Sequence, residues 1–315
     1  MKTIVIIALV GIAAIAVLSL TSFSSNDTEV QFRDFLEKYR VGYSNTYEYN
    51  YRLGVFQENL DRMVELRLKN PLATFGVNQF ADRTPLEMEQ MMGFLPVDTS
   101  DYVTVTKMSA NPVDWSGMWD HVKNQGSCGS CWAFSATATF EARYALSLGK
   151  DHIDTYFSEQ QLVDCQKTGC FGCSGGWMHL SFDYLKTHGF CTDSQYSYTA
   201  RDGSCQYDNL GCSSGPSNKD YKELPFGDEN ALLTELENGP VAVAVDAGAW
   251  FAYAGGILTN CGTQINHGVT LVSSTDEYVR IRNSWGSGWG EGGHIRLAIN
   301  KNTCNYAIKT SIPIF

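Results

Sequence analysis

The sequence Gln125-Gly126-Ser127-Cys128-Gly129-Ser130-Cys131-Trp132-Ala133-Phe134 joins a turn rich in Gly and Ser to an apolar segment. The apolar segment predicts a helix from about Trp132 to Leu148, so Cys131 lies at the N-terminus of that helix. The helix dipole and the unpaired backbone N–H groups at such a position favour a thiolate over a thiol. We therefore interpret Cys131 as a nucleophile and Cys128 as one half of a disulfide.

A Cys-x-x-Cys pair is also found in redox enzymes and in zinc sites. A zinc site would need a second pair of ligands, and Cys170-x-x-Cys173 is not accompanied by histidines. The sequence therefore predicts no metal site, and we expect no cofactor.

A thiolate nucleophile needs a general base, and His267 is the best candidate among the six histidines. His267 begins an apolar segment typical of a strand, and Asn283-Ser284-Trp285-Gly286 follows 16 residues later, after a second strand. Adjacent strands can place Asn283 beside His267, where its side-chain oxygen would orient the imidazole. The five other histidines have no catalytic signature around them, and we interpret them as structural or solvated: His121, His152, His179, His188 and His294.

The composition describes a folded, acidic protein. The chain has 315 residues, of which 43% are hydrophobic and 18% charged, so it can bury a sizeable core and is not disordered. Its formal net charge of −11 excludes the basic surface of a nucleic-acid-binding protein. The same charge argues against an anionic membrane as a partner.

The cysteines and the N-terminus both indicate the secretory pathway. All ten cysteines lie between Cys128 and Cys304, and such a density is typical of an oxidising compartment. At the N-terminus, Met1-Lys2-Thr3 precedes an apolar run from Ile4 to Leu20. This run is slightly shorter than the about 20 residues of a membrane span. We therefore predict a cleaved signal peptide over residues 1–24 rather than a signal anchor, and no stable membrane association after cleavage.

The cysteine-free segment from Glu29 to about Met92 is predicted to be helical. A first helix has one apolar face, made by Phe32, Phe35, Leu36 and Tyr39. A second helix, from about Tyr47 to Leu68, carries a stripe in which a charge pair and an Asn replace aliphatic residues: Glu48, Arg52, Phe56, Asn59 and Met63. Pro71 ends this helix, and residues 75–82 are predicted to be extended.

These motifs resemble those of the papain-like cysteine proteases and occur in the order of that family. They are Gln125 to Trp132, Ser158 to Cys165, Cys173-Ser174-Gly175-Gly176, Asn266-His267-Gly268 and Asn283 to Gly286. The stripe on the second helix and Gly76-x-Asn78-x-Phe80-x-Asp82 resemble the pro-region of the cathepsin L-like branch, although Arg67 stands where its helix motif ends in Asn. The resemblance covers the chain from about Val30 to the C-terminus.

The resemblance implies an enzyme that hydrolyses peptide bonds through a thioester acyl-enzyme. Cys131 would be the nucleophile, His267 the general base and acid, and Asn283 the residue that orients His267. Gln125 would donate a side-chain N–H to the oxyanion hole, together with the backbone N–H of Cys131.

The implied fold is α+β with two lobes, one helical and one resembling a β-barrel, behind an N-terminal helical pro-region. The nucleophile and the base would come from different lobes. Four segments after Pro240 are predicted as strands of the second lobe: Val241–Val245, Val269–Val272, Tyr278–Arg282 and His294–Ile299.

The resemblance also divides the chain into a signal peptide (1–24), an inhibitory pro-region (25–107) and a catalytic domain (108–315). The polar segment between Val97 and Pro112 lacks periodicity, and we expect cleavage between Val103 and Pro112. The expected partners are protein and peptide substrates, the chain's own pro-region as an inhibitor, and cystatin-like inhibitors. We expect a monomer that is exported or resides in a lysosome or acidic vacuole.

Two functions of other classes are compatible with this fold, namely a binding protein and an enzyme that transfers acyl groups or performs other thiol chemistry. A binding protein would be expected to lack the nucleophile or the base, and both are present. Among the proteases, exopeptidase branches carry cleft-blocking insertions or a pro-segment with a cysteine. The segment after Cys173 has no His-His loop and the pro-region has no Cys, so we expect an endopeptidase.

Substrate-binding positions follow from the same resemblance. Gly175 and Gly176 would pair with the substrate backbone, since the absence of Cβ permits close approach, and Trp285 would shield the catalytic hydrogen bond. The pocket for the side chain two residues before the scissile bond would be lined by Trp177, Met178, Ala244, Ile265, Asn266 and Gly268. Lys309 falls at its floor, where its ammonium either turns to solvent or rejects Arg and Lys while tolerating polar or acidic groups.

Family positions suggest three disulfides: Cys128–Cys173, Cys165–Cys205 and Cys261–Cys304. Excluding the nucleophile leaves an odd number of cysteines, so at least one further thiol is free or paired with another molecule. An extra bridge among Cys170, Cys191 and Cys212 is compatible with the sequence, which does not indicate the pair.

Overall fold

The computed structural model of the protein describes residues 25–96 and 111–315. The predicted signal peptide and most of the predicted cleavage region lie outside these residues. Within them, none of the helices combines the length and the apolar character that a membrane span requires.

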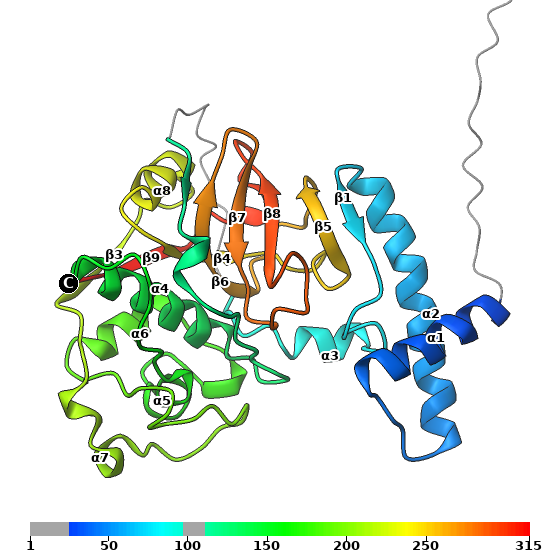
Figure 1. Cartoon of the computed structure of the whole chain (residues 1–315), viewed down its shortest axis with the longest axis horizontal. Helices are drawn as coiled ribbons and strands as arrows, with labels where there is room; N and C mark the ends of the chain where they lie inside the picture. Colours follow the sequence, from blue (N-terminus) through cyan, green and yellow to red (C-terminus); the bar gives the residue numbers. More distant parts are fainter. Residues whose placement is uncertain (1–24, 97–110) are drawn as a thin grey trace, which may run out of the picture.

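The N-terminal part of the described chain forms a small helical unit, at the right of Figure 1. It contains α1 (Ser25–Tyr39), α2 (Thr46–Lys69), β1 (Ala73–Phe75) and α3 (Pro85–Glu89). The apolar face predicted for the first helix packs on α2: the ring of Phe56 lies 5.2 Å from Phe32 and 5.5 Å from Phe35 between centroids. The extended segment predicted for residues 75–82 is present only at its start: Phe75 ends β1, residues 76–78 have no regular secondary structure, and turns occupy residues 79–82.

The polar residues of the α2 stripe hold the segment that follows β1. Arg52 forms a two-pronged ion pair with Glu87 of α3, with both N···O distances at 2.7 Å. Asn59 donates to two backbone carbonyls within residues 81–83, at 2.9 and 2.8 Å. The guanidinium of Arg52 therefore turns away from its own helix toward α3. The stripe ties three segments of the pro-region together.

Five helices accompany the sheet in the rest of the chain. They are α4 (Cys131–Ser147), α5 (Glu159–Cys165), α6 (Met178–Leu185), α7 (Tyr207–Leu210) and α8 (Glu229–Leu236). Single turns of 3-10 helix lie at residues 116–118, 172–174, 212–214 and 303–305. The α4 helix packs against α5 and α6 on one side and against the sheet on the other. It therefore joins the helical lobe to the β lobe, as Figure 1 shows.

The sheet has the strand order β1-β5-β8-β7-β6-β4-β9-β3, with β2 (Val113–Asp114) paired to β6. The remaining strands are β3 (Asp220–Glu223), β4 (Val241–Val245), β5 (Tyr253–Leu258), β6 (His267–Ser274), β7 (Tyr278–Arg282), β8 (His294–Ala298) and β9 (Thr310–Ile314). The predictions for β4 and β7 match to the residue, whereas β3, β5 and β9 were not predicted. In the described chain the path ends at β1 and β3 and does not close, so the β lobe is an open sheet rather than a barrel.

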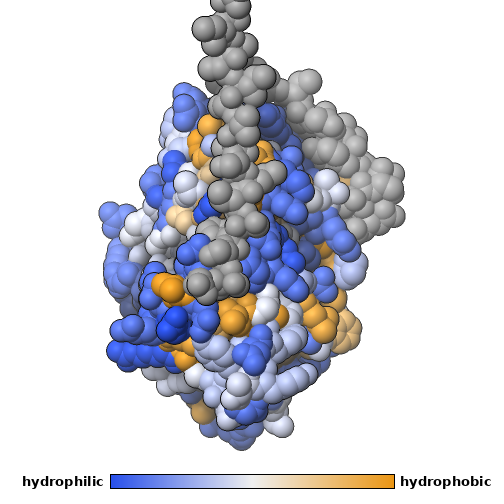
Figure 2. Space-filling view, turned by 90° about the vertical axis from the view of Figure 1, so that its right-hand side faces the viewer, coloured by the Kyte–Doolittle hydropathy of each residue, from blue (hydrophilic) through white to orange (hydrophobic). Residues whose placement is uncertain are grey.

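The N-terminal helical unit adds its own strand, β1, to the sheet of the rest of the chain. Antiparallel β1 pairs with the edge of β5, and Ala73 lies opposite Gly256. Gly256 has φ of 84°, and a Cβ there would lie 2.2 Å from the carbonyl oxygen of Leu72. The pro-region face is largely hydrophilic with separate apolar patches (Figure 2), and its exposed apolar side chains include Leu68, Leu72 and Leu86.

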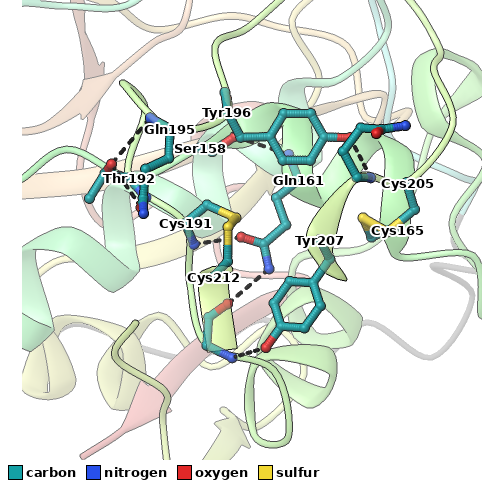
Figure 3. Close-up of a disulfide and its surroundings, with 12 residues drawn as sticks. Ser158, Gln161, Cys165, Cys191, Thr192, Gln195, Tyr196, Cys205, Tyr207 and Cys212 are labelled. Atoms are coloured by element: carbon teal, nitrogen blue, oxygen red, sulfur yellow. Dashed lines mark hydrogen bonds between the residues drawn. A yellow bond between two sulfur atoms is a disulfide. The ribbon is translucent and has the colours of Figure 1, made fainter. Parts of the chain in front are cut away.

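Four disulfides brace the catalytic part. The three pairs implied by the family are present, and the fourth joins Cys191 to Cys212. Gln161 lies beside this fourth bridge and accepts a hydrogen bond from the N–H of Cys191 at 2.7 Å (Figure 3). Among the described residues, Cys131 and Cys170 are the free cysteines, and both are buried.

Candidate active site

Cys131 is the first residue of α4, and its side chain is completely buried. The backbone N–H groups of Gly93 and Gly268 both donate to its Sγ at 3.2 Å. These two donors favour a thiolate, but burial has the larger effect and raises the pKa of Cys131 to about 11. The thiolate expected from the helix N-terminus is therefore disfavoured while the pro-region covers this site, and the sulfur rests as a neutral thiol.

His267 begins β6 and is also completely buried. Its Nε2 lies 2.8 Å from Oδ1 of Asn283. The same oxygen accepts from the N–H of Ser284 at 2.8 Å, so it is an acceptor and the imidazole carries its proton on Nε2. Burial lowers the pKa of His267 to about 4, which keeps the ring neutral. Its Nδ1, with a free lone pair, has no hydrogen-bond partner in the part of the chain that the structure describes.

Gly268, the residue after His267, brings the thiol close to the imidazole. The backbone N–H of Gly268 donates to the sulfur of Cys131, so the start of α4 meets the start of β6 at the predicted nucleophile and base. The Trp285 ring lies 5.0 Å from that of His267 between centroids and is completely buried. Trp285 therefore packs beside the imidazole, where shielding of its bond to Asn283 stays a prediction.

Gln125 presents its side-chain amide beside the same sulfur-bearing turn. Its Nε2 donates to the carbonyl of Met91 at 2.8 Å and to that of Cys128 at 2.9 Å. Its Oε1 accepts from the hydroxyl of Ser284 at 2.6 Å, which fixes the orientation of the amide. The carbonyl of Met91 thus accepts a hydrogen bond from the Gln125 amide. This is the N–H group that the sequence analysis assigned to the oxyanion hole.

Residues 91–94 of the pro-region pass directly over the thiol. The carbonyl of Gly93 accepts from the N–H of Gly176 at 3.0 Å, and the N–H of Phe94 donates to the carbonyl of Asn266 at 3.1 Å. A Cβ at Gly93 would lie 1.6 Å from the carbonyl oxygen of Gly129, so only glycine fits this path. Sequence analysis missed this segment, although a lone Gly between large apolar residues was an available signal.

The side chain of Phe94 is buried among apolar side chains. It shares one buried cluster with four residues that were predicted to line the selectivity pocket: Trp177, Met178, Ala244 and Ile265. The rings of Phe94 and Trp177 meet edge to face at 5.0 Å between centroids. Gly175 borders the segment too, since a Cβ there would lie 3.2 Å from the carbonyl oxygen of Gly93.

Lys309 lies beside Trp177, one of the predicted pocket residues, and has an acidic partner that neither sequence interpretation included. Its Nζ is 5.6 Å from the centroid of the Trp177 ring and 2.6 Å from Oε1 of Glu223. The side chain is 24% exposed. The ammonium is therefore neither free in solvent nor unpaired, and Glu223 is a neighbour that no sequence motif indicated.

These contacts bring together a buried thiol, a neutral imidazole with a free lone pair, and an amide donor aimed at a peptide carbonyl. Such a set is suited to nucleophilic attack on an acyl group with stabilisation of the resulting oxyanion. Residues 25–96 and 111–315 contain no group of three His, Cys, Asp or Glu side chains arranged to hold a metal ion.

Known protein families account for nearly the whole described chain. Residues 109–314 match the family model described as Papain family cysteine protease. Residues 32–88 match the model described as Cathepsin propeptide inhibitor domain. The first match falls on the part that contains Cys131, His267 and Asn283, and the second falls on the helical unit that supplies β1. The segment over Cys131, residues 91–94, lies between the two matched ranges.

Similar proteins and structures agree with these matches. The chain is 37% identical over 308 residues to Cathepsin L 1 of Paramecium tetraurelia, covering 91% of this chain and 93% of that protein. It is 32% identical to Fruit bromelain of Ananas comosus, covering 90% and 85%. The solved structure of digestive procathepsin L2 proteinase from Tenebrio molitor larval midgut has a TM-score of 0.78 and 34% identity, covering 91% and 100%. The chain therefore belongs to the papain family of cysteine proteases, and it carries the inhibitory pro-region of a cathepsin L-like precursor.

Proposed function

We propose that Cys131, His267, Asn283 and Gln125 are the catalytic residues of this cysteine endopeptidase, and that residues 91–94 keep it latent. The observation that carries the proposal is a peptide segment held over the thiol by backbone hydrogen bonds. The N–H of Gly93 faces the sulfur at 3.2 Å. Because an N–H group rather than a carbonyl carbon meets the sulfur, this segment occupies the site without being attacked.

Hydrolysis would begin when the segment leaves and a substrate takes its place. The thiol proton moves to Nδ1 of His267, and the thiolate attacks the scissile carbonyl carbon. The oxyanion accepts hydrogen bonds from Gln125 Nε2 and the backbone N–H of Cys131. His267 then protonates the leaving amine, which departs and leaves a thioester. A water molecule, deprotonated by His267, releases the acid and restores the thiol, while Asn283 stabilises the imidazolium throughout.

The substrate backbone would take over the hydrogen bonds that the pro-region now makes with Gly176 and Asn266. Gly175 leaves room for this close approach, since a Cβ there would lie 3.2 Å from the carbonyl oxygen of Gly93. The side chain two residues before the scissile bond would replace Phe94 against Trp177, Met178, Ala244 and Ile265. An aromatic or branched aliphatic side chain would suit this pocket.

The processing and location of the enzyme complete the proposal. We propose a signal peptide over 1–24, a pro-region over 25–107 and a catalytic domain over 108–315, with cleavage between residues 103 and 112. The four disulfides support passage through an oxidising compartment. A lysosome, an acidic vacuole or the extracellular space would then be the site of action. Cystatin-like proteins are proposed as inhibitors of the processed monomer.

The test compares two cysteine variants of the full-length precursor, Cys131→Ser and Cys170→Ser. Cys170 is the matched control because it is the other free, buried cysteine in the described chain. After acid treatment, wild type and Cys170→Ser should hydrolyse a fluorogenic peptide with Phe two residues before the cleaved bond, and Cys131→Ser should not. N-terminal sequencing of the processed wild type locates the cut. Turnover by Cys131→Ser would refute the assignment, and so would equal activity of the unprocessed and processed wild type at neutral pH.

A further inference from the structure

Charged groups border Trp177, the aromatic wall of the selectivity pocket. The Trp177 ring, which packs against Phe94, lies 5.6 Å from the ammonium of Lys309 and 5.7 Å from the imidazole of His179, measured to the ring centroid. Trp177 immediately precedes α6, His179 lies within α6, and Lys309 immediately precedes β9. Two groups that can carry positive charge therefore flank the aromatic wall that a substrate side chain would touch.

The ammonium of Lys309 and the imidazole of His179 both lie within 4 Å of the same carboxylate. Oε1 of Glu223, at the end of β3, lies 2.6 Å from Nζ of Lys309 and 3.1 Å from Nδ1 of His179. The other charged group facing His179 is Asp183 of α6, which Lys186 already pairs at 2.8 Å. The neutral Tyr221 ring of β3 is 6.1 Å from the imidazole between centroids. Glu223 is thus the carboxylate for which His179 and Lys309 compete.

The net charge of this cluster depends on pH. Burial lowers the pKa of His179 below its ordinary value of 6.5, an effect that Glu223 opposes and Lys309 reinforces. At neutral pH the imidazole is uncharged, Glu223 neutralises Lys309, and the cluster is neutral overall. As the pH falls through the pKa of His179, the imidazolium can satisfy Glu223, and the cluster gains one positive charge.

We propose that Glu223, His179 and Lys309 form a charge-selective end to the Phe94 pocket, which excludes basic substrate side chains and admits anionic ones when the medium is acidic. This inference rests on the proposed function of the pocket as the site for the residue two positions before the scissile bond. A lysine or arginine there would meet the ammonium beside Trp177. An anionic side chain would compete with Glu223 for Lys309 at neutral pH, whereas in acid His179 holds Glu223 and leaves the ammonium to the substrate.

The test measures kcat/KM of the processed enzyme on peptides that differ only at this position. The side chains are Leu, Gln, Arg and homocysteic acid, whose sulfonate stays ionised throughout, so its own titration does not contribute. From pH 7 to pH 4.5 the ratio of homocysteic acid to Gln should rise about three- to tenfold, the effect of one charge at about 6 Å when the effective dielectric constant is about 40–80. Arg should be cleaved far more slowly than Leu at every pH.

Three substitutions separate the roles of the cluster. His179→Gln should make the ratio independent of pH. Glu223→Gln should raise the ratio already at pH 7, because Lys309 then has no competing carboxylate. Lys309→Met should abolish the preference for the sulfonate and increase cleavage after Arg. His188→Gln is the matched control, because His188 is a half-buried histidine stacked on Tyr184, outside this cluster.

Titration of the active-site thiol with an alkylating inhibitor gives the concentration of folded enzyme in each preparation. The inference is overturned if His179→Gln shows the same rise in the ratio as wild type, or if wild type cleaves the Arg peptide as well as the Leu peptide. If no preparation cleaves the Leu peptide, the proposed function itself fails, and that outcome is distinct from a change in the profile.

Discussion

Replacing Gly93 by alanine should increase the fraction of precursor molecules in which residues 91–94 have moved off Cys131. A Cβ at this position would lie 1.6 Å from the oxygen and 2.2 Å from the carbon of the Gly129 carbonyl, whereas ordinary Cβ contacts exceed 3.4 Å. These atoms are backbone and cannot turn aside, so residue 93 must retreat by more than an ångström. Three hydrogen bonds depend on its present position: Gly93 N–H to Cys131 Sγ, Gly176 N–H to Gly93 O, and Phe94 N–H to Asn266 O.

The expected magnitude follows from these losses. Each hydrogen bond contributes about 0.5–1.5 kcal/mol, and part of the burial of Phe94, worth about 1.5–3 kcal/mol in full, is lost with them. Partial relaxation would recover some of this total, so we expect the pro-region to hold the site about 2–4 kcal/mol less tightly. That difference increases the population of the open precursor about 30- to 1000-fold.

The assay is alkylation of Cys131 in the full-length protein at neutral pH, followed by mass spectrometry of the peptide that contains it. When closing is faster than alkylation, the labelling rate reports the open population. Gly54→Ala is the matched control, because Gly54 lies in α2 and a Cβ there has nothing within 4 Å. The control should label no faster than wild type. If Gly93→Ala also labels at the wild-type rate, the path of residues 91–94 over the thiol is wrong.

Three further predictions concern catalysis, the pro-region and the fourth disulfide. Asn283→Ala should lower kcat/KM of the processed enzyme about 10- to 150-fold, because the imidazolium loses a hydrogen bond worth about 1.5–3 kcal/mol; an unchanged pH–rate profile and kcat/KM would contradict this role. Glu87→Gln should lower the Tm of the precursor at pH 6, since Arg52 holds the pKa of Glu87 at about 2 and the ionised pair stabilises the fold. That difference from wild type should vanish as the pH falls from about 4.5 to about 2, and a constant difference across this range would refute the pairing. Replacing both Cys191 and Cys212 by alanine should destabilise the processed enzyme by about 3 kcal/mol in thermal unfolding, as expected for a cross-link across 21 residues; an unaltered Tm would show that this bridge does not constrain the unfolded chain.

The pH behaviour of the catalytic pair also depends on the pro-region. Burial keeps Cys131 as a thiol and His267 as a neutral imidazole while residues 91–94 cover them. Departure of this segment would admit water and remove much of the desolvation, so we expect the thiolate predicted from the sequence to form in the processed enzyme. The pair Arg52–Glu87 remains ionised at pH 5, because the pKa of Glu87 is about 2. Protonation of Glu87 is therefore not expected to release the pro-region at that pH.

Sequence alone was sufficient wherever the signal is local. The helix that begins at Cys131 and the strands Val241–Val245 and Tyr278–Arg282 follow from periodicity within a few turns or residues. The pairing of His267 with Asn283 follows from a short spacing across neighbouring strands, and the structure joins them at 2.8 Å. Short motifs of this kind identify both the family and its catalytic chemistry.

The sequence did not predict strands that lack an alternating pattern, or side-chain pairs between segments far apart in the chain. The β5 strand contains Gly255 and Gly256, which have no side chains to alternate, and its neighbour β1 comes from the pro-region. Arg52 pairs with Glu87 across 35 positions rather than with a residue one turn away. Tertiary packing determines such partners. Helix periodicity predicts on which face of a helix a residue lies, but it does not predict which segment packs against that face.

The chemistry of this protein was thus encoded in local motifs, whereas its latency and its pocket charge were decided only by the tertiary structure. Gly93 lies over Cys131, and Glu223 lies between His179 and Lys309, because segments remote in sequence meet there. The protonation states follow for the same reason, since desolvation depends on everything that surrounds a group and not on its neighbours along the chain. A sequence motif specifies which atoms can react, and the packed fold specifies what covers them and what charge they carry.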